Sequence, residues 1–315
     1  MDALSEVLKV VQFRGAVFFN ASFTAPWTFP SPPGHAIASA LAPGAEQLVL
    51  YHYVTEGECV VSVDGSEAVR LVAGDIVMFP HADAHLMLNP SSANAAPIDV
   101  AALLRERPRE LRAGGGGEAT RFICGYLTCD PHLCRPILTA LPRVLSVSLR
   151  GGDGGWLDRS FQHAVEQAAS PRPGSEGMLA KLSEVMMVET LRRYMEQLPP
   201  EQTGWLAGVR DRLVGRSLAL MHERPAHPWT VEELAREVAA SRSVLAERFT
   251  HFVGQSPMQY LAKWRMALAA DLLRRSALSA ARIAEEIGYE TDTAFSRAFR
   301  REFGMPPATW RKQSA

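Results

Sequence analysis

The spacing of apolar residues divides the chain into an N-terminal part with strand-like patterns and a C-terminal part with helical ones. Between residues 47 and 89, the apolar runs QLVLYHYV, ECVVSV and DIVMF are separated by turn-forming Glu56-Gly57, Asp64-Gly65 and Gly74-Asp75. Short runs with a turn every 8–12 residues or so are typical of a small β-barrel or sandwich. From Asp211 to Arg311, apolar residues instead recur every three or four positions, which predicts helices.

A helical pattern also begins near Leu157. One apolar stripe contains Phe161, Val165 and Ala168, and a second runs from Met178 to Leu191, with SPRPGS at 170–175 between them. We therefore predict three parts: a sensor domain at 1–150, a helical linker at 151–205 and a helical domain at 206–315. The linker is the predicted dimerisation region of a homodimer, with its surface formed by the methionine-rich face of Met178, Met186 and Met187.

The last hundred residues contain two similar helical units. In the first, Thr230 and Glu233 predict a capping box, Ala239-Ala240 forms a tight connection, and Ser241 caps the next helix. In the second, a support helix spans 279–287, Gly288-Tyr289 forms the turn, and a recognition helix spans 291–303. Two short helices joined by such a turn match a helix-turn-helix, whose second helix enters the major groove of DNA.

Charge is distributed unevenly between these parts. Residues 201–315 carry 17 Lys and Arg against 13 Asp and Glu, whereas residues 1–200 carry 16 against 21. A basic C-terminal third indicates contact with phosphate. No apolar run approaches the roughly 18 residues of a membrane span, and the acidic MDALSEVL start does not resemble a signal peptide. These features predict a cytoplasmic, nucleoid-associated protein without a membrane partner.

The segment from WTVEELAREVAASRSVLAERF to FSRAFRREFGMPPATWR resembles the AraC/XylS family of bacterial transcription regulators. The similarity covers about 105 residues and includes Gly254, Pro257, Gly288-Tyr289, Phe295, Phe299, Gly304 and Pro307. It implies a transcription regulator, an activator or a repressor, whose partners are double-stranded promoter DNA and RNA polymerase. The base contacts it implies come from Arg242, Ser243, Ala246 and Glu247 in the first recognition helix and from Asp292, Thr293, Ser296 and Arg297 in the second.

The N-terminal part resembles a cupin barrel. Gly74, Pro80, His85 and Asn89 match the second cupin motif, and His52 with Glu58-x6-Gly65 matches the first. The resemblance implies a module that senses a small-molecule effector, a metal or an oxidant. Val54 occupies a position where metal cupins have a ligand, which argues against the alternative of a metal-dependent cupin enzyme fused to a DNA-binding domain. Since no catalytic triad, carboxylate pair or phosphate loop is found elsewhere, we expect no enzymatic activity.

Histidines and cysteines cluster in the first domain. A zinc site built from His81, His85, Cys124 and Cys129 is one prediction, because soft thiolate and imidazole ligands suit Zn²⁺. Two alternatives stay open: buried, structural cysteines, and a redox-sensing pair among Cys124, Cys129 and Cys134. In the C-terminal domain, His222 is interpreted as a surface residue.

The resulting expectation is an α+β multidomain protein. Its N-terminal part is a cupin-like β-barrel, and its C-terminal part is an all-α domain with two helix-turn-helix motifs.

Overall fold

The chain folds into two compact units, each assembled from separated stretches of sequence. The computed structural model describes residues 2–90, 95–100, 102, 110–150, 155–157, 159–160, 162–163 and 173–314. The sheet unit comprises Phe13–Cys129 and Leu141–Gln197, and the helical unit comprises Met1–Gln12, Asp130–Ala140 and Leu198–Ala315. Each of the three ranges expected from the sequence is continuous along the chain. In the structure, the sheet unit is built from two separate segments and the helical unit from three.

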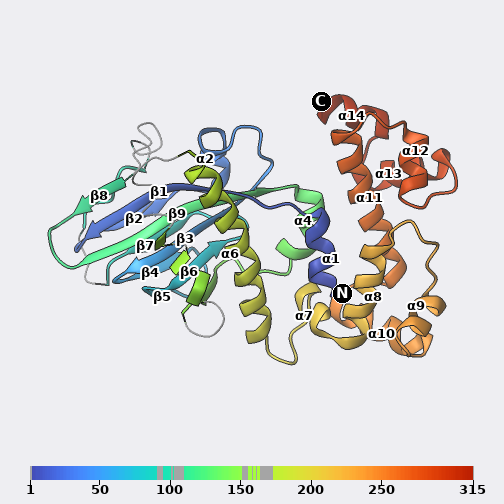
Figure 1. Ribbon diagram of the computed structural model, residues 1–315, viewed down its shortest axis with the longest axis horizontal. Helices are drawn as coiled ribbons and strands as arrows, with labels where there is room; N and C mark the ends of the chain where they lie inside the picture. Colours follow the sequence, from blue (N-terminus) through green and yellow to red (C-terminus); the bar gives the residue numbers. More distant parts are fainter. Residues whose placement is uncertain are drawn as a thin grey trace. The chain divides into compact units, whose positions relative to one another are not determined.

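The sheet unit contains two β-sheets with the core between them. The six-stranded sheet has the order β10-β6-β3-β9-β1-β8 and the four-stranded sheet the order β2-β7-β4-β5 (Figure 1). The strands are β1 Arg14–Thr24, β2 Thr28–Ser31, β3 Gln47–Glu56, β4 Glu58–Val63, β5 Val69–Val72, β6 Asp75–Phe79, β7 His85–Leu88, β8 Glu110–Gly114, β9 Ala119–Cys129 and β10 Leu145–Ser148, with helix α2 at Gly34–Leu41. Among the described strands no ladder joins the two sheets, so the predicted closed barrel is not confirmed.

Aromatic side chains from both sheets fill the core. Phe23 and Phe122 of the larger sheet meet edge to face with ring centroids 4.9 Å apart, and Phe29 of the smaller sheet lies 5.9 Å from Phe23. Buried apolar area of this kind is the main source of folding free energy.

Helix α6, Ser175–Gln197, covers the outer face of the larger sheet (Figure 1). Strand β3 therefore contacts apolar surroundings on both faces, which explains its uninterrupted apolar run. The Ser183 hydroxyl donates to the Leu179 carbonyl, so it accepts from the Tyr51 hydroxyl, 2.7 Å away. Glycine at position 15 permits this close packing, because a Cβ there would lie 2.6 Å from the Cβ of Ser183.

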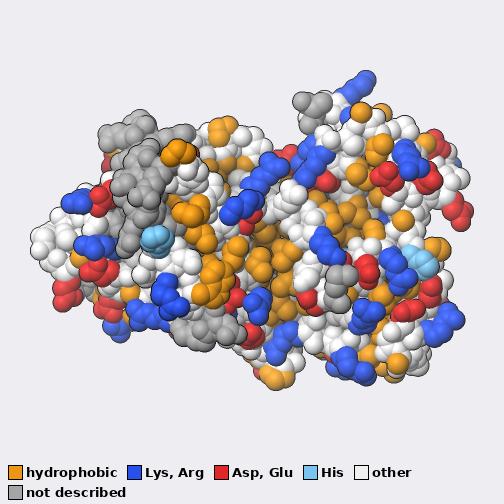
Figure 2. Space-filling model, viewed as in Figure 1, with side chains coloured by type: hydrophobic (Ala, Val, Ile, Leu, Met, Phe, Trp, Pro, Cys, Tyr) orange, Lys and Arg blue, Asp and Glu red, His pale blue; other side chains and the backbone are white. Residues whose placement is uncertain are grey.

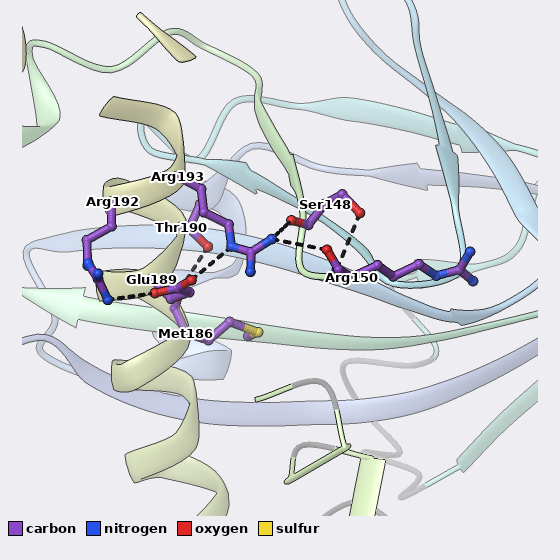
Figure 3. Close-up of polar contacts among 7 residues, drawn as sticks. All are labelled: Ser148, Arg150, Met186, Glu189, Thr190, Arg192 and Arg193. Carbon is purple, nitrogen blue, oxygen red and sulfur yellow. Dashed lines mark hydrogen bonds and ion pairs between the residues drawn. The ribbon is translucent and has the colours of Figure 1, made fainter. Parts of the chain in front are cut away.

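Polar contacts fix the C-terminal half of α6 to the loop after β10. The Arg193 guanidinium donates to the carbonyls of Ser148 and Arg150, and its Nε lies 2.8 Å from Glu189 Oε1 (Figure 3).

This packing overturns the predicted dimer surface. Met186 and Met187 are fully buried within the sheet unit, and of the three methionines only Met178 is exposed. The predicted helix containing Phe161, Val165 and Ala168 lies outside the described residues.

The helical unit gathers helices from three parts of the chain. They are α1 Ala3–Val10, α4 Pro131–Leu138, α7 Trp205–Arg210, α8 Arg212–Glu223, α9 Val231–Glu237, α10 Arg242–Val253, α11 Pro257–Arg275, α12 Ala280–Glu286, α13 Asp292–Phe303 and α14 Pro307–Ser314. Helix α1 packs on α8, and α4 packs on α11 and α7. No helix in the described part of the chain is both long and apolar enough to cross a membrane.

The pairs α9–α10 and α12–α13 are built alike. Thr230 and Ser279 cap the first helix of each pair, and Ser241 and Thr291 cap the second through backbone N–H groups three residues on. Each second helix ends at a left-handed glycine, Gly254 or Gly304.

Only half of the predicted capping box at Thr230 forms. The Thr230 hydroxyl accepts from the Glu233 N–H, but the Glu233 carboxylate turns away to His227, with 2.8 Å between Nε2 and Oε1.

The turns of the two pairs use different residues at the same left-handed position. Ala239 has φ +54° and Gly288 has φ +80°. A Cβ in this region costs about 1 kcal/mol.

We therefore expect Ala239→Gly to raise the free energy of unfolding of the helical unit by about 0.5–1 kcal/mol. The greater freedom of glycine in the unfolded chain reduces this gain. Urea denaturation measures this change, and a loss of stability would contradict the strain assigned to Ala239.

Candidate nucleic-acid interface and buried histidine–cysteine cluster

Helices α10 and α13 each bury one face and expose the other. Leu245 and Phe249 of α10, and Phe295 and Phe299 of α13, are fully buried. The eight predicted base-contact residues lie away from these anchors. Six are exposed, while Ala246 and Ser296 are half-buried at matching positions of the two helices. Arg242, Ser243, Glu247, Asp292, Thr293 and Arg297 are the exposed ones.

The two predicted arginine contacts differ in their surroundings. Arg242 forms an ion pair with Glu232 of α9 at 2.8 Å, both side chains being largely exposed. Such surface pairs contribute at most about 1 kcal/mol, so Glu232 holds the Arg242 side chain only weakly. Arg297 is exposed and forms no ion pair with any described residue.

Arg248, in the middle of α10, is paired with the residue that caps α8. Its guanidinium contacts the Asp211 carboxylate at 2.6 Å, and the same carboxylate caps α8 through the N–H groups of Leu213 and Val214. One buried carboxylate therefore links the orientation of α10 to α8. On the face drawn in Figure 2, basic and acidic side chains are interspersed over the helical unit.

A chain of buried polar groups crosses the core of the sheet unit. His52 of β3 lies opposite Cys124 of β9, with 2.8 Å between Nδ1 and Sγ. Its Nε2 lies 2.8 Å from Nε2 of His85 on β7 in the other sheet. His85 Nδ1 donates to the Asp83 carbonyl at 2.9 Å, and its ring stacks on Phe79 at 3.7 Å between centroids.

These contacts define one proton order. Because His85 Nδ1 donates to a carbonyl, a neutral His85 accepts at Nε2 from His52 Nε2–H. His52 Nδ1 then accepts from the Cys124 thiol. Burial keeps all three groups uncharged. It lowers the pKa of His85 to about 4 and raises the pKa of the Cys124 thiol. Burial also lowers the pKa of His52 well below its ordinary value, and the nearby His85 adds to this effect.

The four residues of the predicted zinc site are not brought together. His81 is exposed in the turn after β6, whereas His85 and Cys124 both contact His52. Cys124 and Cys129 are five residues apart on the continuous strand β9 and so face opposite sides, since the extra residue in the β1–β9 pairing lies on β1, between Val17 and Phe19. Within the described residues no group of three His, Cys, Asp or Glu side chains is arranged to hold a metal ion.

The first cupin motif is also incomplete as a ligand set. Glu58 forms an ion pair with Arg70 on the smaller sheet, and Val54 is buried in the core. The pairing of His52 with Cys124 was not found from sequence, because it depends on the register of strands 72 residues apart.

All four cysteines are free thiols, which leaves the redox pair untested. Burial disfavours the reactive thiolate at Cys124 and leaves Cys129 the more accessible thiol of β9.

Comparison with known proteins identifies both parts of the chain. Residues 2–196 match a family described as cupin, and residues 234–313 match a family described as helix-turn-helix domain. A Streptomyces antibioticus protein named as an AraC-like transcription regulator is 32% identical over 314 residues and aligns with 99% of each chain. The Escherichia coli RCS-specific HTH-type transcriptional activator RclR is 26% identical over 315 residues, covering 99% of this chain and 98% of its own.

A solved DNA-binding domain is similar to part of this chain. The DNA-binding domain of AdpA in complex with a target DNA is 31% identical, covers 33% of this chain and 92% of its own, and gives a TM-score of 0.32.

Proposed function

Because the chain belongs to the AraC-like transcription regulators that carry an N-terminal cupin domain, we propose that it reads a specific DNA sequence through α10 and α13. The observation that carries this proposal is the repeated build of the two helix pairs. Each presents three exposed candidate contact residues at the same positions of its second helix. We propose that both pairs are helix-turn-helix motifs.

Two such motifs in one chain can occupy two consecutive segments of the major groove. The long helix α11 connects them and fixes their separation. A single protomer therefore suffices for recognition, and a homodimer would extend the site rather than create it.

We propose that the sheet unit senses rather than catalyses. Its polar chain of His52, His85 and Cys124 is uncharged and enclosed by aromatic rings, so it offers neither a nucleophile nor an open coordination position. This interpretation favours a regulatory cupin over the enzyme alternative.

Arg297 provides the test of sequence reading. An arginine directed at a guanine edge donates two hydrogen bonds and contributes about 1–3 kcal/mol of discrimination. We expect Arg297→Ala to weaken binding to the cognate site by roughly 10- to 100-fold while changing binding to random DNA little.

The cognate site is first selected from genomic fragments bound by the full-length protein. Dissociation constants are then measured on that site and on random DNA by fluorescence anisotropy. Arg192→Ala is the matched control, since this exposed arginine lies on α6 of the sheet unit. Equal losses on both DNAs would show that Arg297 contacts phosphate only.

A further inference from the structure

A pocket of about 290 Å³ lies inside the helical unit. Helices α4, α7 and α11 form its walls together with the C-terminal ends of α10 and α13. Five aromatic side chains line it: His132, Trp205, Tyr260, Trp264 and Phe303. Rings on several sides suit a flat apolar molecule better than a flexible polar one.

Two buried polar atoms of the pocket lining have no hydrogen-bond partner. They are Nε1 of Trp264, whose side chain is 2% exposed, and Oε1 of Gln255. The neighbouring indole of Trp205 does have a partner, since it donates to the Tyr260 hydroxyl at 2.8 Å. A buried N–H without an acceptor is unfavourable, so the Trp264 indole is a donor that a ligand acceptor satisfies once the side chains covering Nε1 move aside.

The charged groups of the lining give the pocket a positive balance. Arg135 and Lys263 contribute two cations, against the single carboxylate of Glu302. The Glu302 Oε1 atom lies 3.9 Å from a guanidinium nitrogen of Arg135, whereas Lys263 forms no ion pair within the described part of the chain. An unpaired ammonium and an unpartnered N–H donor among the residues of one pocket favour an anionic ligand.

From this arrangement we propose that the pocket binds a small aromatic carboxylate. Its ring lies among the aromatic walls, and its carboxylate accepts from the Trp264 indole and faces the Lys263 ammonium. The Gln255 amide can present either its oxygen or its NH₂ group to a ligand substituent.

The position of the pocket gives the ligand a regulatory effect. Helix α4 contacts both halves of the helical unit: it packs on α7, which contacts α10, and it pairs with α11 and α13 through Asp130–Arg274 and Arg135–Glu302. A ligand inserted between α4 and α11 therefore shifts α13 relative to α10 and changes the fit of the two helices to DNA. This consequence rests on the proposed function, whereas ligand binding itself does not.

The experiment is isothermal titration calorimetry on the full-length protein without DNA. The probe is 1-naphthoate, and 1-naphthalenemethanol is its neutral counterpart. We expect one molecule of naphthoate per chain and at least tenfold weaker binding of the alcohol. Trp264→Phe, which keeps a ring but removes the donor, and Lys263→Gln should each weaken naphthoate binding about three- to tenfold.

Ala267→Leu tests the location, since Ala267 lines the pocket and a larger side chain fills it. It should abolish binding, while Lys312→Gln, an exposed lysine on α14, should leave it unchanged. If Ala267→Leu fails to fold, naphthoate binding by Lys263→Gln, a substitution at an exposed position, remains the deciding measurement. Absence of naphthoate binding at millimolar concentration, equal binding of the alcohol, or unchanged binding by the folded Ala267→Leu or Lys263→Gln variant overturns the proposal.

Discussion

Acidification from pH 6.5 to pH 4 is expected to lower the free energy of unfolding of the sheet unit by about 3 kcal/mol through His85 alone. Burial lowers the pKa of this imidazole to about 4, against an ordinary value of 6.5. One pKa unit corresponds to about 1.4 kcal/mol. Between these two pH values the unfolded chain binds a proton that the folded chain does not, so stability is complete above pH 6.5 and falls as the pH drops toward 4.

Urea denaturation at pH 7.0, 6.0, 5.0 and 4.0 measures this effect. His85→Gln, which cannot gain the charge, should show a shallower loss than the wild type. His81→Gln is the control, because His81 lies four residues away but is exposed. Parallel pH profiles for the wild type and His85→Gln would exclude His85 as the source.

Gly288→Ala is expected to cost the helical unit about 2–4 kcal/mol. Two effects combine: a Cβ at φ +80° is strained, and it would lie 2.3 Å from the Ala226 carbonyl oxygen. Backbone atoms cannot move aside cheaply, so the turn between α12 and α13 must shift. Thermal denaturation of the full-length variant gives the size of the effect.

Gly304→Ala separates these two contributions. Gly304 has φ +75°, but a Cβ at this residue would meet nothing within 4 Å, so this variant retains only the conformational cost of about 1 kcal/mol. Equal losses for the two variants would show that the approach of Ala226 contributes nothing.

Local features of this fold were predictable from sequence, because neighbouring residues determine them. Ser241 caps α10 and Gly288 lies in the turn before α13, both as predicted, since a cap or a tight turn depends on a few consecutive residues. The recurrence of apolar residues every three or four positions also predicted helices here, and Phe295 and Phe299 form the buried face of one of them, α13.

Features that depend on packing between distant segments were not predictable. His222 was interpreted as a surface residue but is buried, where its Nε2 lies 2.8 Å from the Tyr260 hydroxyl. Nothing near it in sequence signals this, because α1 and α11 complete its surroundings only in the folded unit. The positions of α1 and α4 in the helical unit were missed for the same reason.

The discontinuous make-up of the helical unit also bears on how such regulators can diversify. The chain passes between the two units four times, at residues 12–13, 129–130, 140–141 and 197–198. A single genetic crossover near residue 200 would join a new sensor to a helical unit deprived of its own α1 and α4. A recombinant of this kind must inherit a compatible α1 and α4 from the new sensor. Successful exchange of sensors is therefore restricted to donors in which both short helices already match α8 and α11 of the recipient.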